Sequence, residues 1–159
     1  MKKSISTQQE NMVADYLGWK TVVASGARDF HKGDVVSSEW LGECKTHIKK
    51  VDKISFYLSD YLKIFNEAMS KFKKPILICD DGTQTVKGTY VLISFKHVPD
   101  WVYMSFKFHM IFEPSRTNIH IVGKMKDEFD GYIFTKWSDL GQIIILRLEI
   151  FRKMIEGEI

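Results

Sequence analysis

The chain has 159 residues, of which 45% are hydrophobic and 27% charged, and its formal net charge is +3 at pH 7. This length and composition are typical of a single folded domain with its own core, which we expect over residues 1–159. The small positive excess does not by itself indicate a nucleic-acid partner. No apolar run reaches the length of about 18 residues that a membrane-spanning helix needs, so no membrane partner is expected.

The cysteines and the N-terminus predict a compartment. The first residues, Met-Lys-Lys-Ser-Ile-Ser, lack the apolar segment of a signal peptide. Cys44 and Cys79 lie in apolar, strand-like runs and form no CxxC pair, so a zinc site is not expected. Two buried free thiols suit a reducing environment. The sequence therefore predicts a cytoplasmic protein.

The chain begins with a predicted helix over residues 7–17, in which apolar residues recur at the i, i+4 spacing of one helix face. Thr7 and Glu10 have the spacing of a capping box, which would start this helix, and Gly18 would end it. A strand and then a polar loop bounded by glycines are expected next, over residues 20–25 and 26–33.

Two strands joined by a tight turn are predicted after the loop, over residues 34–37 and 40–47. Alternate residues of an extended strand share a face. Glu43 and Lys45 therefore share one face of the second strand, and Cys44 lies on the other. An acid and a lysine together on a half-buried strand indicate a specific role for the pair.

After these strands, a stripe of apolar residues predicts a helix over residues 59–74, with Ser59 as its N-cap. A buried strand at 76–79 comes after it, which suggests a crossover back into the same sheet. The apolar stripe expected to face the core is Leu58, Tyr61, Leu62, Phe65, Met69 and Phe72. Further strands are expected over residues 89–95, 101–112, 118–123 and 131–137, and a closing helix over residues 138–156. This order predicts an α/β fold with a mixed sheet.

The acids and the lysine suit the hydrolysis of phosphodiester bonds. This reaction needs an activated water, a neutralised leaving oxygen and a positioned phosphate, and a divalent cation held by carboxylates supplies all three. Asp34 is at the start of one predicted strand and Glu43 lies on its neighbour, so the two can converge on one ion, with the Cys44 carbonyl as a further ligand. Hard oxygen ligands select Mg²⁺, for which Mn²⁺ can substitute. Lys45 points to the side of Glu43 and can orient or help to deprotonate the attacking water.

Asp34 together with the E-C-K run at 43–45 resembles the PD-(D/E)xK pattern of metal-dependent nucleases, with Gly33 in place of the proline. The resemblance covers about residues 6–79, where the helix, strand, "SGARDFHKGD" loop and ExK strand follow the order seen in archaeal-type Holliday junction resolvases. It implies a restriction-endonuclease-like core with a mixed central sheet flanked by helices. Residues 80–159, outside the recognisable part, would add extra strands and a terminal helix.

The resemblance also implies a role for each residue. Glu10, Asp34, Glu43 and Lys45 would be catalytic, and Glu10 would join Asp34, Glu43 and Cys44 at the metal. The residues expected to hold DNA are Ser25, Arg28, Lys32, Lys49, Lys50 and Lys53. The protein is therefore expected to be a Mg²⁺-dependent DNA endonuclease. A Holliday junction resolvase that acts in DNA recombination, as a homodimer on branched DNA, is the favoured form.

Other interpretations of the same residues remain open. Glu10 can serve only to cap the first helix, and Glu43 with Lys45 can form an exposed ion pair that contributes little to stability. A nuclease of restriction, repair or replication would show the same pattern, and so would a non-catalytic nucleic-acid-binding protein that retains the fold. The Asp-Asp-Gly run at 80–82 favours a turn over a second metal site.

Overall fold

The computed structural model describes residues 4–22, 33–105, 107–111, 117–122, 130–134 and 136–157. Its helices are α1 (Ile5–Leu17), α2 (Leu58–Ser70), α3 (Asp100–Ser105) and α4 (Leu148–Glu156), with 3₁₀ turns at Phe95–His97 and Ser138–Leu140. Its strands are β1 (Lys20–Thr21), β2 (Val35–Val36), β3 (Trp40–Lys45), β4 (Lys53–Tyr57), β5 (Lys74–Asp80), β6 (Thr89–Ser94), β7 (Lys107–Ile111), β8 (Asn118–Val122), β9 (Asp130–Phe134) and β10 (Ile143–Arg147).

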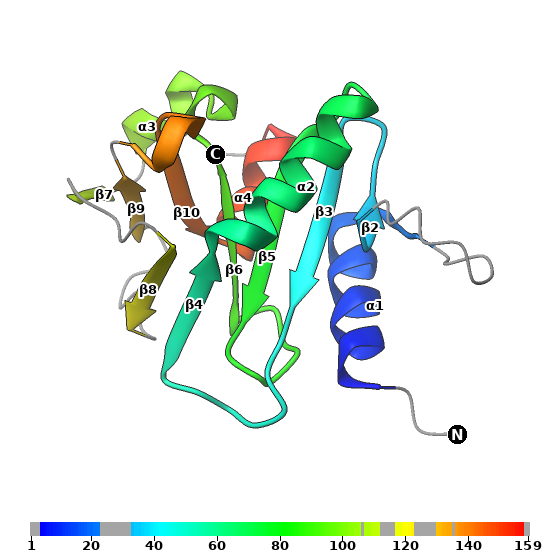
Figure 1. Cartoon of the computed structure of the whole chain (residues 1–159). Helices are drawn as coiled ribbons and strands as arrows, with labels where there is room; N and C mark the ends of the chain where they lie inside the picture. The colour runs from blue at the N-terminus through cyan, green and yellow to red at the C-terminus, as the bar shows by residue number, and fades with distance from the viewer. Residues whose placement is uncertain are drawn as a thin grey trace.

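Within these residues, eight strands form one mixed sheet in the order β1-β2-β3-β5-β6-β10-β9-β7 (Figure 1). β3 and β5 are parallel and joined through α2, so the predicted crossover is confirmed. β7 and β9 are also parallel, and the other neighbours are antiparallel. β4 and β8 form a separate antiparallel pair. The predicted α/β class, a large mixed sheet flanked by helices, is confirmed.

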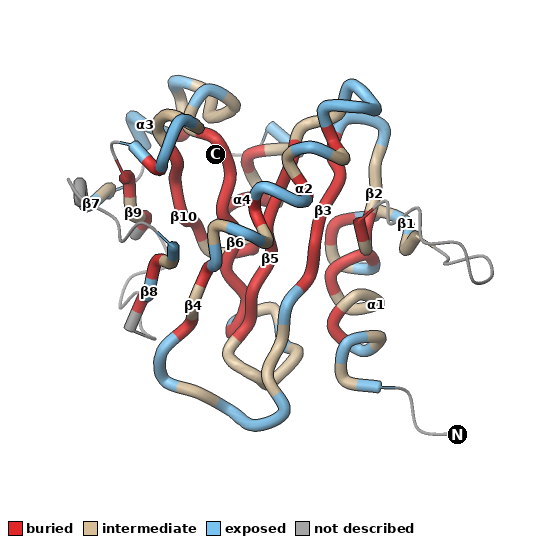
Figure 2. Tube along the Cα trace, in the orientation of Figure 1, coloured by how far each residue is buried: buried red, intermediate tan, exposed pale blue. Residues whose placement is uncertain are grey.

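The large sheet is covered on both faces (Figure 2). α1 and α4 pack on one face, against buried residues that include Trp40 and Cys44 of β3. α2 and the β4–β8 pair pack on the other face, against a cluster that includes Leu41. The predicted alternation of β3 is therefore correct, although every residue of the strand except Lys45 is buried. Within the described parts of the chain, no helix is both long and apolar enough to cross a bilayer.

The first helix begins earlier than predicted. Ser4 is the N-cap of α1, and its side chain accepts a hydrogen bond from the backbone N–H of Thr7. Thr7 is therefore inside the helix, and the predicted capping box of Thr7 and Glu10 is wrong. Gly18 ends the helix in the left-handed conformation, at φ 71°, as predicted.

The second helix is shorter than predicted and faces the core with only part of the predicted stripe: Tyr61 is buried, and Leu58 and Phe65 pack against the same cluster. β4 runs directly into α2, so Tyr57 rather than Ser59 stands at the N-cap, and the helix ends at Ser70. The buried positions follow a helical spacing: Tyr61, Ile64 and Ala68. Three residues of the predicted stripe are exposed instead: Leu62, Met69 and Phe72.

The last part of the chain departs furthest from the prediction. Residues 138–156 form a 3₁₀ turn, β10 and α4 rather than one helix. Ile144 and Leu146 of β10 point into the α1/α4 side of the core, whereas Ile143 and Ile145 point into the α2 side. A run of residues that is buried on both faces shows no period, so its pattern cannot separate strand from helix. The predicted strand over 101–112 likewise begins as α3.

Candidate active site

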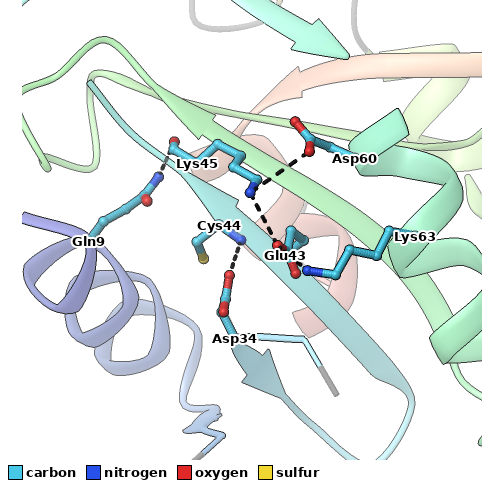
Figure 3. A network of polar contacts seen from close by, with 7 residues as sticks. All are labelled: Gln9, Asp34, Glu43, Cys44, Lys45, Asp60 and Lys63. Carbon is cyan, nitrogen blue, oxygen red and sulfur yellow. Dashed lines mark hydrogen bonds and ion pairs between the residues drawn. The ribbon is translucent and has the colours of Figure 1, made fainter. Parts of the chain in front are cut away.

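Asp34, Glu43 and Lys45 lie close together where β2 lies against β3 (Figure 3). Asp34 directly precedes β2, and its Oδ2 accepts a hydrogen bond of 2.8 Å from the backbone N–H of Cys44. The backbone N–H of Asp34 donates to the carbonyl oxygen of Gly42 at 2.7 Å. Because main chain and side chain are both bonded to β3, the Asp34 carboxylate is fixed beside Glu43.

Two glycines allow this close approach of the strands. Gly33 has φ +73°, and a Cβ there would lie 2.8 Å from the carbonyl oxygen of Gly42. A Cβ on Gly42 would lie 2.8 Å from Cγ2 of Val35 and 3.1 Å from Cγ2 of Ile76. A side chain at either position would therefore push β2, and Asp34 with it, away from β3.

Glu43 is the buried acid of the site, at 4% exposure. Its Oε1 lies 3.4 Å from Nζ of Lys45 and 3.3 Å from Nζ of Lys63, which reaches it from α2. Nζ of Lys45 also lies 3.8 Å from Oδ1 of Asp60, at the start of α2. Glu43 and Lys45 do form an ion pair, but the burial of Glu43 means that the pair is not an ordinary surface one.

Lys45 is positively charged at neutral pH. Burial on its own would lower the pKa of its ammonium group, but Asp60 and Glu43 outweigh burial and raise the pKa above its ordinary value. A protonated lysine donates hydrogen bonds and cannot accept a proton. In this arrangement Lys45 is suited to orient a water or a phosphate oxygen rather than to act as a base.

Glu10 completes the group from α1. Its pKa is raised from 4.5 to about 7, first by burial and then by the charges of Asp34 and Glu43. Burial and Glu43 also raise the pKa of Asp34, although the hydrogen bond from Cys44 and the two nearby lysines oppose the shift. The raised pKa values of Glu10 and Asp34 indicate that the negative charge of this group is incompletely neutralised. A cation placed among them would relieve the repulsion.

Gln9 holds α1 in place beside the site. It is fully buried, and its Nε2 donates a hydrogen bond of 2.6 Å to the backbone oxygen of Lys45. This bond fixes the helix against the end of β3, and the next residue in the chain is Glu10. Gln9 therefore acts as a positioning residue for the glutamate.

Sequence reasoning missed Gln9, Asp60 and Lys63. Asp60 and Lys63 are three residues apart, so they share one face of α2. The crossover connection places this helix against β3. Their spacing was therefore a usable signal once the crossover had been predicted. A single glutamine on a helix gives no such signal.

The predicted DNA-binding residues are only partly described. Lys49, Lys50 and Lys53 are exposed, and they follow the end of β3 that carries Lys45. Ser25, Arg28 and Lys32 lie outside the described residues. Three of the six predicted residues therefore lie in the described part of the chain, on the segment that follows Lys45.

Asp80 and Asp81 form a turn, as predicted. Oδ1 of Asp80 accepts a hydrogen bond from the backbone N–H of Gly82 at 2.9 Å, and Oδ1 of Asp81 accepts one from the N–H of Thr83 at 3.1 Å. The turn packs on the loop after β3, where the N–H of Val51 donates to the backbone oxygen of Asp81 at 2.8 Å. These acids support the loop that carries Lys49 and Lys50.

The donors of the site suit a hard divalent cation. In the described residues no three His, Cys, Asp or Glu side chains stand in a metal-holding arrangement. Glu43 instead faces two ammonium groups, and Asp34 accepts a hydrogen bond from a backbone N–H. The available donors are nevertheless all oxygens: the three carboxylates and the carbonyl of Cys44. This carbonyl projects from the same edge of β3 as the N–H bonded to Asp34. Burial raises the pKa of the Cys44 thiol well above its ordinary value, which disfavours a thiolate ligand.

The shifted pKa of Glu10 predicts how stability depends on pH without metal. An acid whose folded-state pKa is raised stabilises the fold below its unfolded pKa of 4.5, and this stability is lost as pH rises through about 7. The full shift would correspond to roughly 3 kcal/mol, but Glu10 is only partly buried, so we expect about 1 kcal/mol.

We therefore expect Glu10→Gln to be more stable than the wild type in EDTA at pH 8, by about 2–4 °C in Tm, and to match it at pH 4.5. Thermal melts across this pH range test the expectation, with Asp15→Asn, an exposed acid on the same helix, as the matched control. Added Mg²⁺ should reverse the order at pH 8, because it stabilises the protein that binds it. An unchanged pH profile in Glu10→Gln would refute the clustering of the acids.

No family model, no curated protein and no solved structure matches the chain. The case for a function therefore rests on the geometry of the site.

Proposed function

We propose that the protein is a Mg²⁺-dependent endonuclease that hydrolyses phosphodiester bonds in DNA, and that its target is the Holliday junction. The observation that carries the proposal is the convergence of Asp34, Glu43 and Lys45 at the meeting point of β2 and β3, with Glu10 approaching from α1. The two alternatives for these residues were a helix cap for Glu10 and an exposed ion pair for Glu43. They account neither for the burial of Glu43 nor for the effect of Asp34 and Glu43 on the pKa of Glu10.

The order of the elements supports a restriction-endonuclease-like core. α1 is followed by β1, β2 and β3 as antiparallel neighbours, and α2 then leads to β5 parallel to β3. β4 comes between β3 and α2 but pairs outside this sheet. Gly33 stands where the nuclease pattern has proline, and its backbone explains the difference. Its φ is +73°, whereas a proline ring fixes φ near −65° and cannot adopt that angle.

The chemistry is divided among the residues of the site. Asp34, Glu43 and Glu10, with the Cys44 carbonyl, would hold the cation. Bound there, it would neutralise charge on the phosphate and lower the pKa of a water. Lys45, kept protonated by its two acidic neighbours, orients the attacking water or a phosphate oxygen by donating a hydrogen bond. The exposed lysines after β3 bind neighbouring phosphates of the DNA: Lys49, Lys50 and Lys53.

Two symmetric cuts in one junction need two active sites, so we propose that the protein acts as a homodimer. The C-terminal helix α4 does not offer an apolar interface, because its apolar residues lie in the core of its own chain: Leu148, Ile150, Phe151 and Met154. The proposed dimer must therefore use another surface. α3 offers two exposed, largely apolar side chains for this purpose, Tyr103 and Met104.

Cleavage of defined DNA substrates tests the proposed function. The protein is incubated with labelled four-way junction, duplex and single-stranded DNA, each with Mg²⁺, Mn²⁺ or EDTA. Paired, metal-dependent cuts in the junction are expected. Cuts confined to duplex or single strands would keep the chemistry and assign a target in restriction, repair or replication. Salt-sensitive binding without cleavage at any metal concentration would replace the nuclease with a nucleic-acid-binding protein.

A further inference from the structure

Two lysines share one oxygen of the buried glutamate. Nζ of Lys45 and Nζ of Lys63 lie 3.4 Å and 3.3 Å from the same Oε1 of Glu43. Figure 3 shows Lys45 coming from β3 and Lys63 from α2, with both ammonium groups turned toward this carboxylate. Lys45 belongs to the nuclease pattern. Lys63 does not belong to this pattern, and the proposed chemistry assigns it no role.

A divalent cation on Glu43 would compete with this arrangement. Both lysines use the same oxygen, Oε1, so a cation that coordinates this oxygen takes lone pairs from them, and its charge repels ammonium groups nearby. Binding of the metal at Oε1 therefore favours the departure of one lysine.

Lys63 is the lysine that can leave. Lys45 keeps a second carboxylate, Asp60, at 3.8 Å. For Lys63, the hydrogen bond and ion pair given in the described residues are those to Glu43, although its charge also acts on the nearby Asp34. Its side chain is 45% exposed, and four methylene groups let its ammonium swing from the surface of α2 while staying near the site.

We propose that Lys63 is a phosphate-binding residue of the active site, held on Glu43 until a divalent cation replaces it there. This inference rests on the proposed function, because it needs a metal ion at Glu43 and a phosphodiester beside that ion. The released ammonium donates a charge-assisted hydrogen bond to a non-bridging oxygen of the bound phosphate. Lys63 thus neutralises Glu43 in the metal-free protein and the phosphate in the complex.

If a cation replaces Lys63 on Glu43, Lys63→Gln should raise the affinity for the metal and lower the rate of cleavage. Without DNA, the variant should bind Mn²⁺ about two- to fivefold more tightly than the wild type, because no ammonium of Lys63 competes for Glu43. At saturating Mg²⁺, single-turnover cleavage of DNA should fall about 10- to 100-fold, and the salt dependence of DNA binding should weaken by about one phosphate contact. Mn²⁺ binding is read from its electron paramagnetic resonance signal, so this readout does not depend on cleavage.

Two further variants separate this role from others. Lys71→Gln removes the same charge from an exposed residue just beyond α2 and should change neither quantity. Lys63→Arg keeps the charge and should retain most of the cleavage. Circular dichroism verifies that each variant is folded.

The outcomes distinguish the two proposals. Tighter Mn²⁺ binding with slower cleavage in Lys63→Gln supports the exchange. If the Mn²⁺ affinity and the cleavage rate of Lys63→Gln are both unchanged, or if both fall, the proposed exchange is overturned. The proposed nuclease function is not affected by either result. A wild-type protein that neither binds Mn²⁺ nor cleaves DNA overturns the proposed function, and the role of Lys63 with it.

Discussion

Glu43→Gln is expected to lower metal-dependent DNA cleavage by about 10²–10³-fold or more, with DNA binding largely kept. The substitution preserves the size of the side chain but removes the charge that faces Lys45 and Lys63 and that would hold the cation. Single-turnover cleavage of a labelled junction at saturating Mg²⁺ measures the effect on the chemical step, and a separate binding assay measures affinity.

The matched control is Glu39→Gln, which removes an exposed acid from the turn just before the same strand. It should cleave at the wild-type rate. Glu43→Gln is expected to remain folded, because Lys45 and Lys63 have side chains that are each 45% exposed and can turn toward water. A folded Glu43→Gln protein that cuts at the rate of the control would remove Glu43 from the chemistry.

The second large effect is expected in the core, at β10. Ile144→Ala and Ile145→Ala should each lower the free energy of unfolding by about 2–5 kcal/mol. Both residues are fully buried, and each is packed against a different face of the sheet. Urea denaturation monitored by circular dichroism measures the two changes.

Ile48→Ala is the control for these variants, since Ile48 is 87% exposed and its loss should change stability by no more than about 0.5 kcal/mol. The pair of core variants also distinguishes strand from helix. In an amphipathic surface helix, two adjacent residues are not both buried against opposite layers. A near-neutral result for either isoleucine would contradict the central position of β10.

The part of the site that could be predicted lies on β3. Alternation along a strand places Glu43 and Lys45 on one face whether or not the strand is buried, so a local pattern was enough. The crossover from β3 through α2 to β5 could also be predicted from the sequence, because a helix between two buried strands commonly joins parallel neighbours.

The features that the sequence did not predict depend on contacts between segments that are distant in the chain. β4 pairs with β8, and Ser55 of β4 is hydrogen-bonded at 2.6 Å to Nδ1 of His120. No local pattern specifies a pairing across that separation. Gln9 is placed by one bond to a backbone oxygen, which depends on how α1 packs. The helix predicted over β10 failed because four successive residues, 143–146, are buried on two faces and show no period.

The proposed nuclease depends on the clustered acids forming a site for a divalent cation. This site is tested by titration of Mn²⁺ into the metal-free wild type and into Asp34→Asn, followed by electron paramagnetic resonance. Saturable binding by the wild type, displaced by Mg²⁺ and lost in a folded Asp34→Asn protein, is the predicted result. Absence of saturable binding in the wild type, or equal binding by both proteins, would contradict a metal site at Asp34 and with it the proposed nuclease.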